Sequence, residues 1–111
     1  PALARAALPG ARGGVLPIFY SSRALHDLER LFDFLAEQDA SGAQTAVEVI
    51  VDAVTVLQRH PHIGRPVRGP IRELVISRGK TAYVALYRVR AGLERVEVLA
   101  IRHQREAGYS A

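Results

Sequence analysis

The hydrophobic positions of the chain follow a helical period in its first half and a strand-like period after residue 70. Ser21 or Ser22 is suited to cap a helix, because a serine hydroxyl accepts a hydrogen bond from a free backbone N–H in the first turn. Apolar residues then recur at steps of three and four, at Leu25, Leu28, Phe32 and Leu35. Polar residues fill the opposite side, at His26, Asp27, Glu29, Arg30, Asp33 and Glu37. The pattern predicts an amphipathic helix that ends near the break "DASGA" around Gly42.

A second helix is predicted over residues 43–59, although many of its residues are β-branched and individually poor helix formers. The segment is longer than an ordinary strand. Its few polar residues fall at steps of four, three and four, at Glu48, Asp52, Thr55 and Arg59. The short break before it indicates that the two helices form an antiparallel hairpin. Because its apolar surface is wider than one packing contact uses, we expect the sheet or another chain to cover part of it.

Four runs of the chain have the length and composition of strands. Residues 15–20, "VLPIFY", contain Pro17, which lacks a backbone N–H donor, and this predicts an edge strand. Residues 71–77, 81–89 and 94–101 follow one another through short turns, so they predict an antiparallel meander. The predicted order β-α-α-β-β-β describes an α+β domain in which a helical hairpin is packed on a small antiparallel sheet.

The stretch "RHPHIGRPVRGPIREL", residues 59–74, connects the second helix to the meander. Pro61 ends the helix, because proline disfavours helical geometry in the preceding residue and cannot donate a backbone hydrogen bond. His60 and His62 would supply two metal ligands, but the chain has no Cys and no further ligand is implied nearby. We interpret residues 59–70 as a structural crossover and predict no metal site and no cofactor.

Residues 1–14, "PALARAALPGARGG", have no acidic residue and no stable period. We interpret them as a flexible extension, an expression remnant or mis-assigned upstream sequence, and we assign residues 15–111 to a single domain. No apolar run reaches the roughly 18 residues that a membrane span needs, so no membrane association is expected. The absence of Cys suits the reducing cytoplasm, where we expect the protein to act.

The charge of the chain is divided unevenly at Arg59. Four arginines face seven acidic residues before this position, whereas ten arginines and Lys80 face four glutamates from it onward. Such an asymmetry suits a polyanion or an acidic protein partner, although a solvated basic surface gives the same count. A plain RNA-binding module is disfavoured, because bases usually stack on aromatic side chains and the seven present here lie mostly in apolar strands or the first helix.

Taken in order, several of these segments resemble the RelE/ParE superfamily of toxins from type II toxin–antitoxin pairs. The resemblance rests on the helix pair with "HPHIGRPV", on "IRELVIS" and "YVALYRV", and on the terminal "VEVLAIRHQREAGY", and it runs from about Pro17 to Tyr109. It implies a small bacterial toxin held inactive by a partly disordered ParD- or RelB-like antitoxin. That partner typically lays a helix along the toxin and can add a strand to its sheet. Operator DNA is then contacted only indirectly, through the antitoxin complex.

The superfamily contains two mechanisms. RelE-like members cleave mRNA in the ribosome without metal, which requires a base, an acid and cations around the phosphate. For this mechanism the resemblance implies candidate catalytic residues at Arg72, Arg78, Lys80, His103 and Tyr109. The lysine-rich cluster of such nucleases is reduced here to Lys80, and guanidinium groups are poor proton shuttles. The alternative interpretation is that His103 is an ordinary surface residue and that Tyr109 belongs to a frayed terminus.

ParE-like members, with which plasmid stabilisation proteins are grouped, instead inhibit DNA gyrase through a protein–protein contact. We favour this hypothesis, because two long helices with a wide aliphatic surface and an incomplete acid–base set fit a poison better than an enzyme. The resemblance implies target-contact residues at Arg72, Arg102 and Arg105. It implies an antitoxin seat at Val49, Val56, Tyr83 and Tyr87. The alternative interpretation of the two tyrosines is the sheet core, since their period-two spacing fits an inner strand face.

Overall fold

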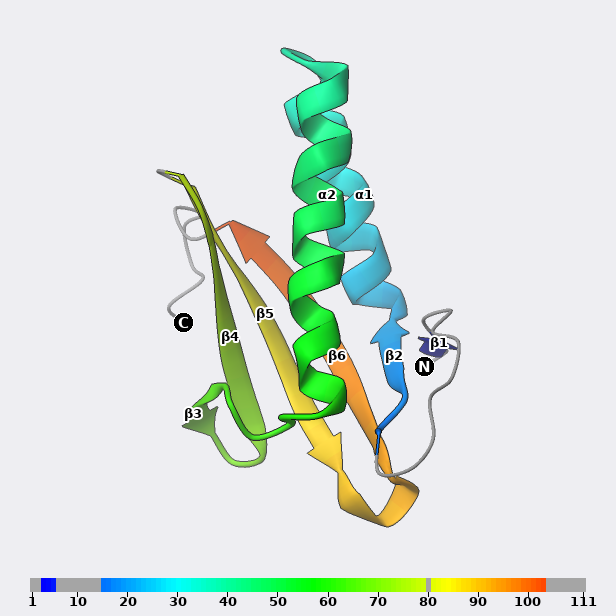
Figure 1. The fold of residues 1–111 in the computed structure, drawn as a ribbon. Helices are drawn as coiled ribbons and strands as arrows, with labels where there is room; N and C mark the ends of the chain where they lie inside the picture. Colours follow the sequence, from blue (N-terminus) through cyan, green and yellow to red (C-terminus); the bar gives the residue numbers. More distant parts are fainter. Residues whose placement is uncertain (1–2, 6–14, 80, 104–111) are drawn as a thin grey trace.

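The computed structural model describes residues 3–5, 15–79 and 81–103 and shows a helical hairpin standing on a twisted sheet (Figure 1). Its elements are β1 (Leu3–Arg5), β2 (Ile18–Ser21), α1 (Ser22–Ala36), α2 (Ala40–Val54), the 3-10 turn η1 (Thr55–Gln58), β3 (Arg65–Arg68), β4 (Ile71–Arg78), β5 (Thr81–Arg90), the 3-10 turn η2 (Ala91–Leu93) and β6 (Arg95–His103). The α+β class and the predicted order of one strand, two helices and three strands are confirmed. The structure also contains two short strands, β1 and β3, that were not predicted.

The sheet has the strand order β1-β2-β6-β5-β4-β3 among the described residues. Strands β4, β5 and β6 form the predicted antiparallel meander. Strand β2 pairs in parallel with β6 and antiparallel with β1, so the sheet is mixed and β2 is not an edge strand. The prediction of an edge strand was wrong because Pro17 lies just before β2, so its missing N–H does not interrupt the pairing of the strand. The carbonyl of Pro17 still accepts the N–H of Val96 at 3.0 Å.

Two short strands lie outside the predicted elements. Residues 1–14 were left out of the predicted fold, yet Leu3–Arg5 pair with β2 as β1. Arg65–Arg68 form β3 within the predicted crossover and pair with the start of β4. Both are short edge strands without an apolar alternation of their own, and they form because a neighbouring strand offers unpaired backbone groups.

The start of α1 is fixed by Ser21, as the sequence predicted. Its Oγ accepts a hydrogen bond from the N–H of Ala24 at 3.0 Å and donates one to the carbonyl of Leu99 at 3.0 Å. The first bond satisfies a backbone donor that has no partner inside the helix. The second ties the beginning of α1 to β6, so the cap also sets the position of the helix on the sheet.

The predicted second helix is α2, continued by η1, and it begins at Ala40. Gly42, which was expected to break the chain, lies in the first turn of this helix. The break falls on residues 37–39 instead. Asp39 has an extended backbone (φ −159°, ψ 102°), and the helix begins directly after it. Gly42 does not interrupt the helix, because a single glycine costs a helix only about 1 kcal/mol.

The helical segment Ala40–Gln58 is 19 residues long with a mean hydropathy of 1.3, so by length and composition it is able to cross a membrane. The expectation that no segment reaches this length is therefore wrong. The core helix of a soluble protein passes the same test. In this fold the segment buries five side chains in the core, at Ala43, Ala46, Ile50, Val54 and Leu57.

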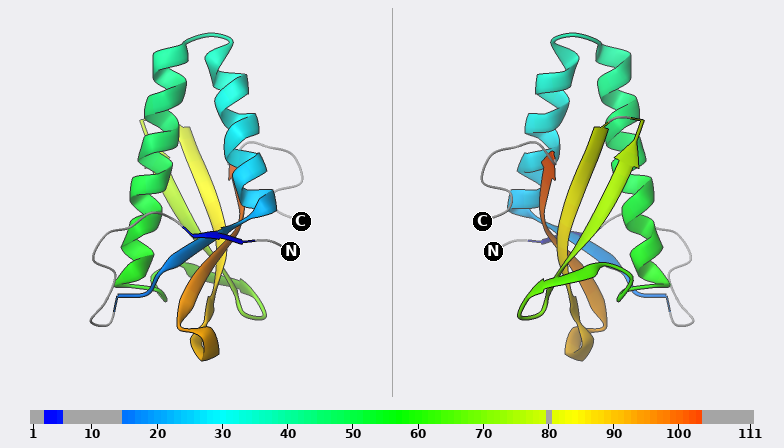
Figure 2. Two further views of the ribbon diagram at one scale, coloured as in Figure 1. Left: turned by 90° about the vertical axis from the view of Figure 1, so that its right-hand side faces the viewer. Right: turned by 90° about the vertical axis from the view of Figure 1, so that its left-hand side faces the viewer.

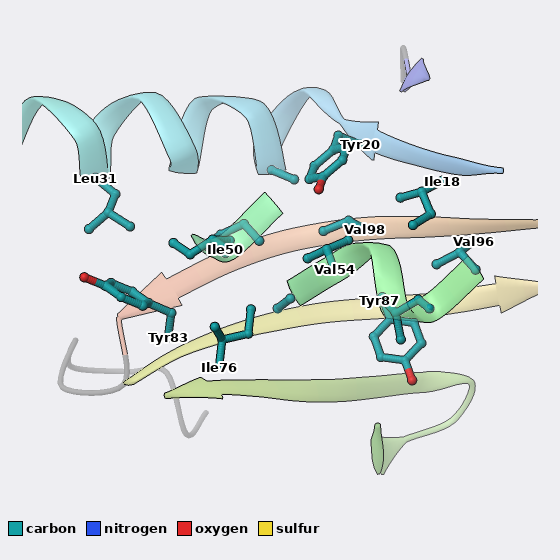
Figure 3. Packing of buried hydrophobic residues seen from close by; sticks show 14 residues of the cluster. Ile18, Tyr20, Leu31, Ile50, Val54, Ile76, Tyr83, Tyr87, Val96 and Val98 are labelled. Carbon is teal, nitrogen blue, oxygen red and sulfur yellow. The ribbon is translucent and has the colours of Figure 1, made fainter. Parts of the chain in front are cut away.

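The core lies between α2 and the sheet (Figure 3). Ile50 and Val54 of α2 gather there with side chains from β2, β4, β5 and β6. The helix α1 continues the line of β2 and lies beside β6. The tip of the helical hairpin projects beyond the end of the sheet (Figure 2).

The buried side of α1 is rotated from the predicted apolar stripe but overlaps it, since Leu28 and Leu35 of that stripe pack against the core. Ala24, Asp27 and Leu31 are buried, whereas Leu25 of the predicted apolar stripe is 43% exposed. The rotation follows from Asp27, whose Oδ2 accepts the N–H of Ile101 on β6 at 2.9 Å. A carboxylate that meets a backbone donor is stable in a buried position that an unpaired charge would not tolerate.

Candidate functional site

The crossover between α2 and β4 is fastened to the sheet by Arg72 and Tyr87, which pair across β4 and β5. Nη1 of Arg72 donates hydrogen bonds to the carbonyls of Gly64 at 2.8 Å and of His62 at 3.3 Å. Oη of Tyr87 accepts the N–H of Gly64 at 2.8 Å. A Cβ at Gly64 would lie 2.5 Å from Oη of Tyr87 and 2.6 Å from the carbonyl of Glu73, so only glycine permits this close approach.

A hollow of about 200 Å³ lies beside this fastening and is lined by His62, Pro66, Gly69, Pro70, Arg72 and Val89. Burial raises the pKa of Tyr87 behind it, although the hydrogen bond from Gly64 and the nearby Arg72 lower that pKa. The phenol therefore stays protonated at neutral pH. The lining of the hollow includes a guanidinium and an imidazole but no carboxylate, so its chemistry suits an anion.

Arg72 and His103, the candidate nuclease residues whose side chains the structure describes, lie toward opposite ends of the sheet, Arg72 near the start of β4 and His103 at the end of β6 (Figure 1). His103 pairs with Tyr83 on β5, and the two rings meet edge to face with centroids 5.4 Å apart. Arg72 pairs with Tyr87, four residues further along β5, which corresponds to about 13 Å of strand. Outside the described residues lie the Arg78 side chain, Lys80 and Tyr109. Within residues 15–79 and 81–103, no group of three His, Asp or Glu side chains is placed to hold a metal ion.

Arg102, a predicted target contact, is held by its own chain. Its Nη1 lies 3.2 Å from Oδ1 of Asp27, and 20% of its side chain is exposed. The other carboxylate oxygen of Asp27 binds the N–H of Ile101, at the point where β2 has ended and α1 takes its place beside β6. Arg102 therefore serves the packing of α1 on the sheet and leaves little surface for a partner. Arg105 lies outside the described residues.

The four residues assigned to an antitoxin seat fall into two groups. Tyr83 and Tyr87 are 2% and 0% exposed, so they belong to the core and a partner cannot reach them in this structure. The structure corrects their assignment, because the inner strand face that their spacing indicated is the face that α2 covers. Val49 on α2 and Val56 on η1 are half-buried at the margin of the core and keep a surface that a partner can contact.

Glu97 on β6 is a buried carboxylate surrounded by three arginines. Its Oε1 lies 2.8 Å from Nε of Arg88 and 3.6 Å from Nη1 of Arg90, and its Oε2 lies 2.7 Å from Nη2 of Arg95. The guanidinium of Arg95 also lies over the ring of Phe19, 4.9 Å from its centroid. Burial raises the pKa of Glu97, but the hydrogen bonds from Arg88 and Arg95 outweigh burial and bring the pKa below its ordinary value. One carboxylate thus orders three cations.

Sequence reasoning missed the roles of Asp27 and Glu97. For Glu97 a signal was available, since it lies two residues from Arg95 in "ERVEVLAI" and period two places both on one face. For Asp27 there was none. Its place on the polar side of α1 is that of a solvated carboxylate, and only the position of β6 shows that it is buried.

Comparisons with known proteins agree with this fold. Residues 18–108 match a family model described as "ParE toxin of type II toxin-antitoxin system, parDE". Toxin RelE3 of Caulobacter vibrioides (strain ATCC 19089 / CIP 103742 / CB 15) is 34% identical over 84 residues, which cover 76% of this chain and 89% of that protein. A solved structure of the chromosomal ParDE TA system from P. aeruginosa is similar with a TM-score of 0.69 and 25% identity, covering 82% of this chain and 98% of that one.

Proposed function

The chain belongs to the ParE toxin family of type II toxin–antitoxin systems, and on this premise we propose that it inhibits DNA gyrase through a protein–protein contact. The family implies an antitoxin partner. We propose a ParD-like chain for that role and the cytoplasm, where gyrase works, as the place of action.

The separation of Arg72 and His103 carries this proposal. Metal-independent cleavage of RNA needs a proton acceptor, a proton donor and a stabilising cation around one phosphodiester. Arg72 directs Nη1 to the crossover carbonyls, and His103 lies at the other end of the sheet. This arrangement of the described residues supports an inhibitor that acts by contact more than a nuclease.

The gyrase proposal is tested with the purified protein at micromolar concentration in a supercoiling assay. It is expected to block supercoiling or to trap cleaved DNA, and the antitoxin is expected to restore activity. Relaxation of the same plasmid by a type I topoisomerase serves as the control for a general effect on DNA. Normal supercoiling by gyrase at this concentration of the protein would refute the proposal.

For the antitoxin seat we retain Val49 and Val56. A near-isosteric Val→Thr change at either position places a hydroxyl in the contact, which costs about 1–2 kcal/mol and weakens binding about tenfold. Val75, which is 50% exposed on β4, provides the matched control Val75→Thr. Calorimetry with the protein encoded in the neighbouring reading frame measures the difference. Equal antitoxin affinities for all three variants and the original chain would show that Val49 and Val56 do not bind the antitoxin.

The similarity to a relative that bears the name Toxin RelE3 supports a second candidate, a RelE-like ribosome-dependent mRNA endoribonuclease. Stalled ribosome complexes would then show cuts in the A-site codon that disappear with His103→Ala. The change Arg72→Ala is less informative, because it also releases the crossover at His62 and Gly64. Uncut mRNA in the presence of the toxin would dismiss this candidate.

A further inference from the structure

Arginines gather on the face of the sheet opposite to α2. Cross-strand partners share a face, and successive residues of a strand alternate between faces. Tyr87 faces the core, so Arg88 faces away from it, together with its partners Ile71 on β4 and Glu97 on β6. The arginine face, as defined by this register, consists of Arg65, Arg68, Arg88, Arg90 and Arg95.

Two buried glutamates hold most of these arginines in place. Glu73, 5% exposed, is ion-paired with Arg65, and Glu97, 1% exposed, holds the three arginines of β5 and β6. Arg68 is exposed and forms no ion pair with a described residue. Five guanidinium groups against two carboxylates leave an excess of three positive charges on the arginine face.

The arginine face has more hydrogen-bond donors than its glutamates can satisfy. Each guanidinium carries five N–H donors, whereas one carboxylate offers about four lone pairs. The side chains of Arg65, Arg88 and Arg90 are 78%, 36% and 41% exposed. These side chains are therefore partly exposed, while their contacts with buried carboxylates restrict their orientations, and this lowers the entropy cost of binding an anion.

The charges are also polarised along the molecule. Exposed acidic residues lie at the tip of the helical hairpin, at Asp33, Glu37 and Asp39. The arginine face lies toward the opposite end, near η2, where β5 joins β6 (Figure 1). The longest extent of the molecule is 42 Å. Near a polyanion, this separation turns the arginine face toward the polyanion and the hairpin tip away from it.

We propose that the arginine face binds the phosphate backbone of duplex DNA. The inference rests on the proposed function, because gyrase holds duplex DNA and a toxin docked on gyrase lies close to it. Planar guanidinium forks match phosphate oxygens in a bidentate geometry. Contacts to phosphates require spaced cations but no side chain that reads a base, and sequence-independent binding follows.

An acidic protein is the less suitable occupant of the arginine face. Stable protein interfaces are centred on apolar or aromatic anchors that fill a pocket. Among the described residues, the aromatic side chain beside these arginines is Phe19, and the guanidinium of Arg95 already lies over its ring. An acidic partner would therefore find no uncovered aromatic ring among the described residues of this face.

The test measures binding of the full chain to a short labelled duplex of random sequence by fluorescence anisotropy, over roughly 50 to 200 mM salt. Each phosphate contact contributes about 0.9 to the slope of log K against log salt. Arg68→Ala and Arg90→Ala are each expected to lower this slope by about one, and the double variant by about two. Arg23→Ala, which removes an exposed arginine of α1, is the matched control and is expected to lower it less.

Slopes that fall equally in Arg23→Ala and in the two test variants would overturn the inference. So would poly-glutamate that binds the original chain more tightly than the duplex does, because the face would then be an acidic-protein site. The gyrase assay separates the two proposals. Inhibition with unaltered DNA binding in the variants refutes only the DNA contact, whereas no inhibition refutes the gyrase function.

Discussion

Replacing Asp27 by alanine is expected to destabilise the fold more than any other change of an acidic residue on α1. The carboxylate of Asp27 has three partners: the N–H of Ile101 at 2.9 Å, Arg102 at 3.2 Å and Arg30 at 3.8 Å. Asp27 itself is 4% exposed. The change would leave a backbone donor of β6 and a largely buried guanidinium without their acceptor.

The magnitude follows from the burial of each partner. A buried N–H without an acceptor costs about 1–3 kcal/mol. Loss of one member of a buried ion pair costs about 3–5 kcal/mol, and the 20% exposure of Arg102 puts this pair toward the lower value. The contact with Arg30, whose side chain is 47% exposed, adds at most about 1 kcal/mol. We expect a total of about 3–4 kcal/mol, since the terms overlap.

Urea unfolding at neutral pH measures this difference. Asp33→Ala is the matched control, because Asp33 is exposed on the same helix and the change alters helix propensity in the same way, so about 0.5 kcal/mol or less is expected. Asp27→Asn keeps an acceptor for Ile101 but loses the ion pair with Arg102, so we expect about 2–3 kcal/mol, less than for alanine. The reasoning is refuted if Asp27→Ala behaves like Asp33→Ala, or if the asparagine variant is as unstable as the alanine variant.

Three further predictions concern the crossover and the arginine face. Gly64→Ala is expected to lose about 1–3 kcal/mol in urea unfolding, because its Cβ would displace Oη of Tyr87, and an unchanged midpoint would contradict the close approach. Tyr87→Phe leaves the N–H of Gly64 without its acceptor and is expected to cost about 1–3 kcal/mol by the same assay. The lowered pKa of Glu97 means that its contribution is complete above its unfolded pKa of about 4.3 and is lost as the pH falls through the folded value. The stability difference between the original chain and Glu97→Gln is thus expected to be largest at neutral pH and to shrink below about pH 4, and a difference that does not change with pH would contradict this role of Glu97.

The local sequence determined the elements that depend on short-range chemistry. Ser21 caps α1 because its hydroxyl reaches a donor three residues away, and the meander of β4, β5 and β6 follows from period-two runs joined by short turns. The order of these elements also carried the family resemblance that the comparisons support. The length and phase of residues 43–59 were enough to identify α2 against the preference of its β-branched residues.

Tertiary structure decided every assignment that depends on what lies opposite a residue. Tyr83 and Tyr87 have the same spacing on an open face and on a covered one, and the position of α2 makes them core. Asp27 is buried because β2 ends beside β6 and leaves the N–H of Ile101 to be satisfied. The register of β5 and β6 gathers three arginines around Glu97. Periodicity specifies which residues share a face of an element, but only packing between distant segments specifies what that face meets.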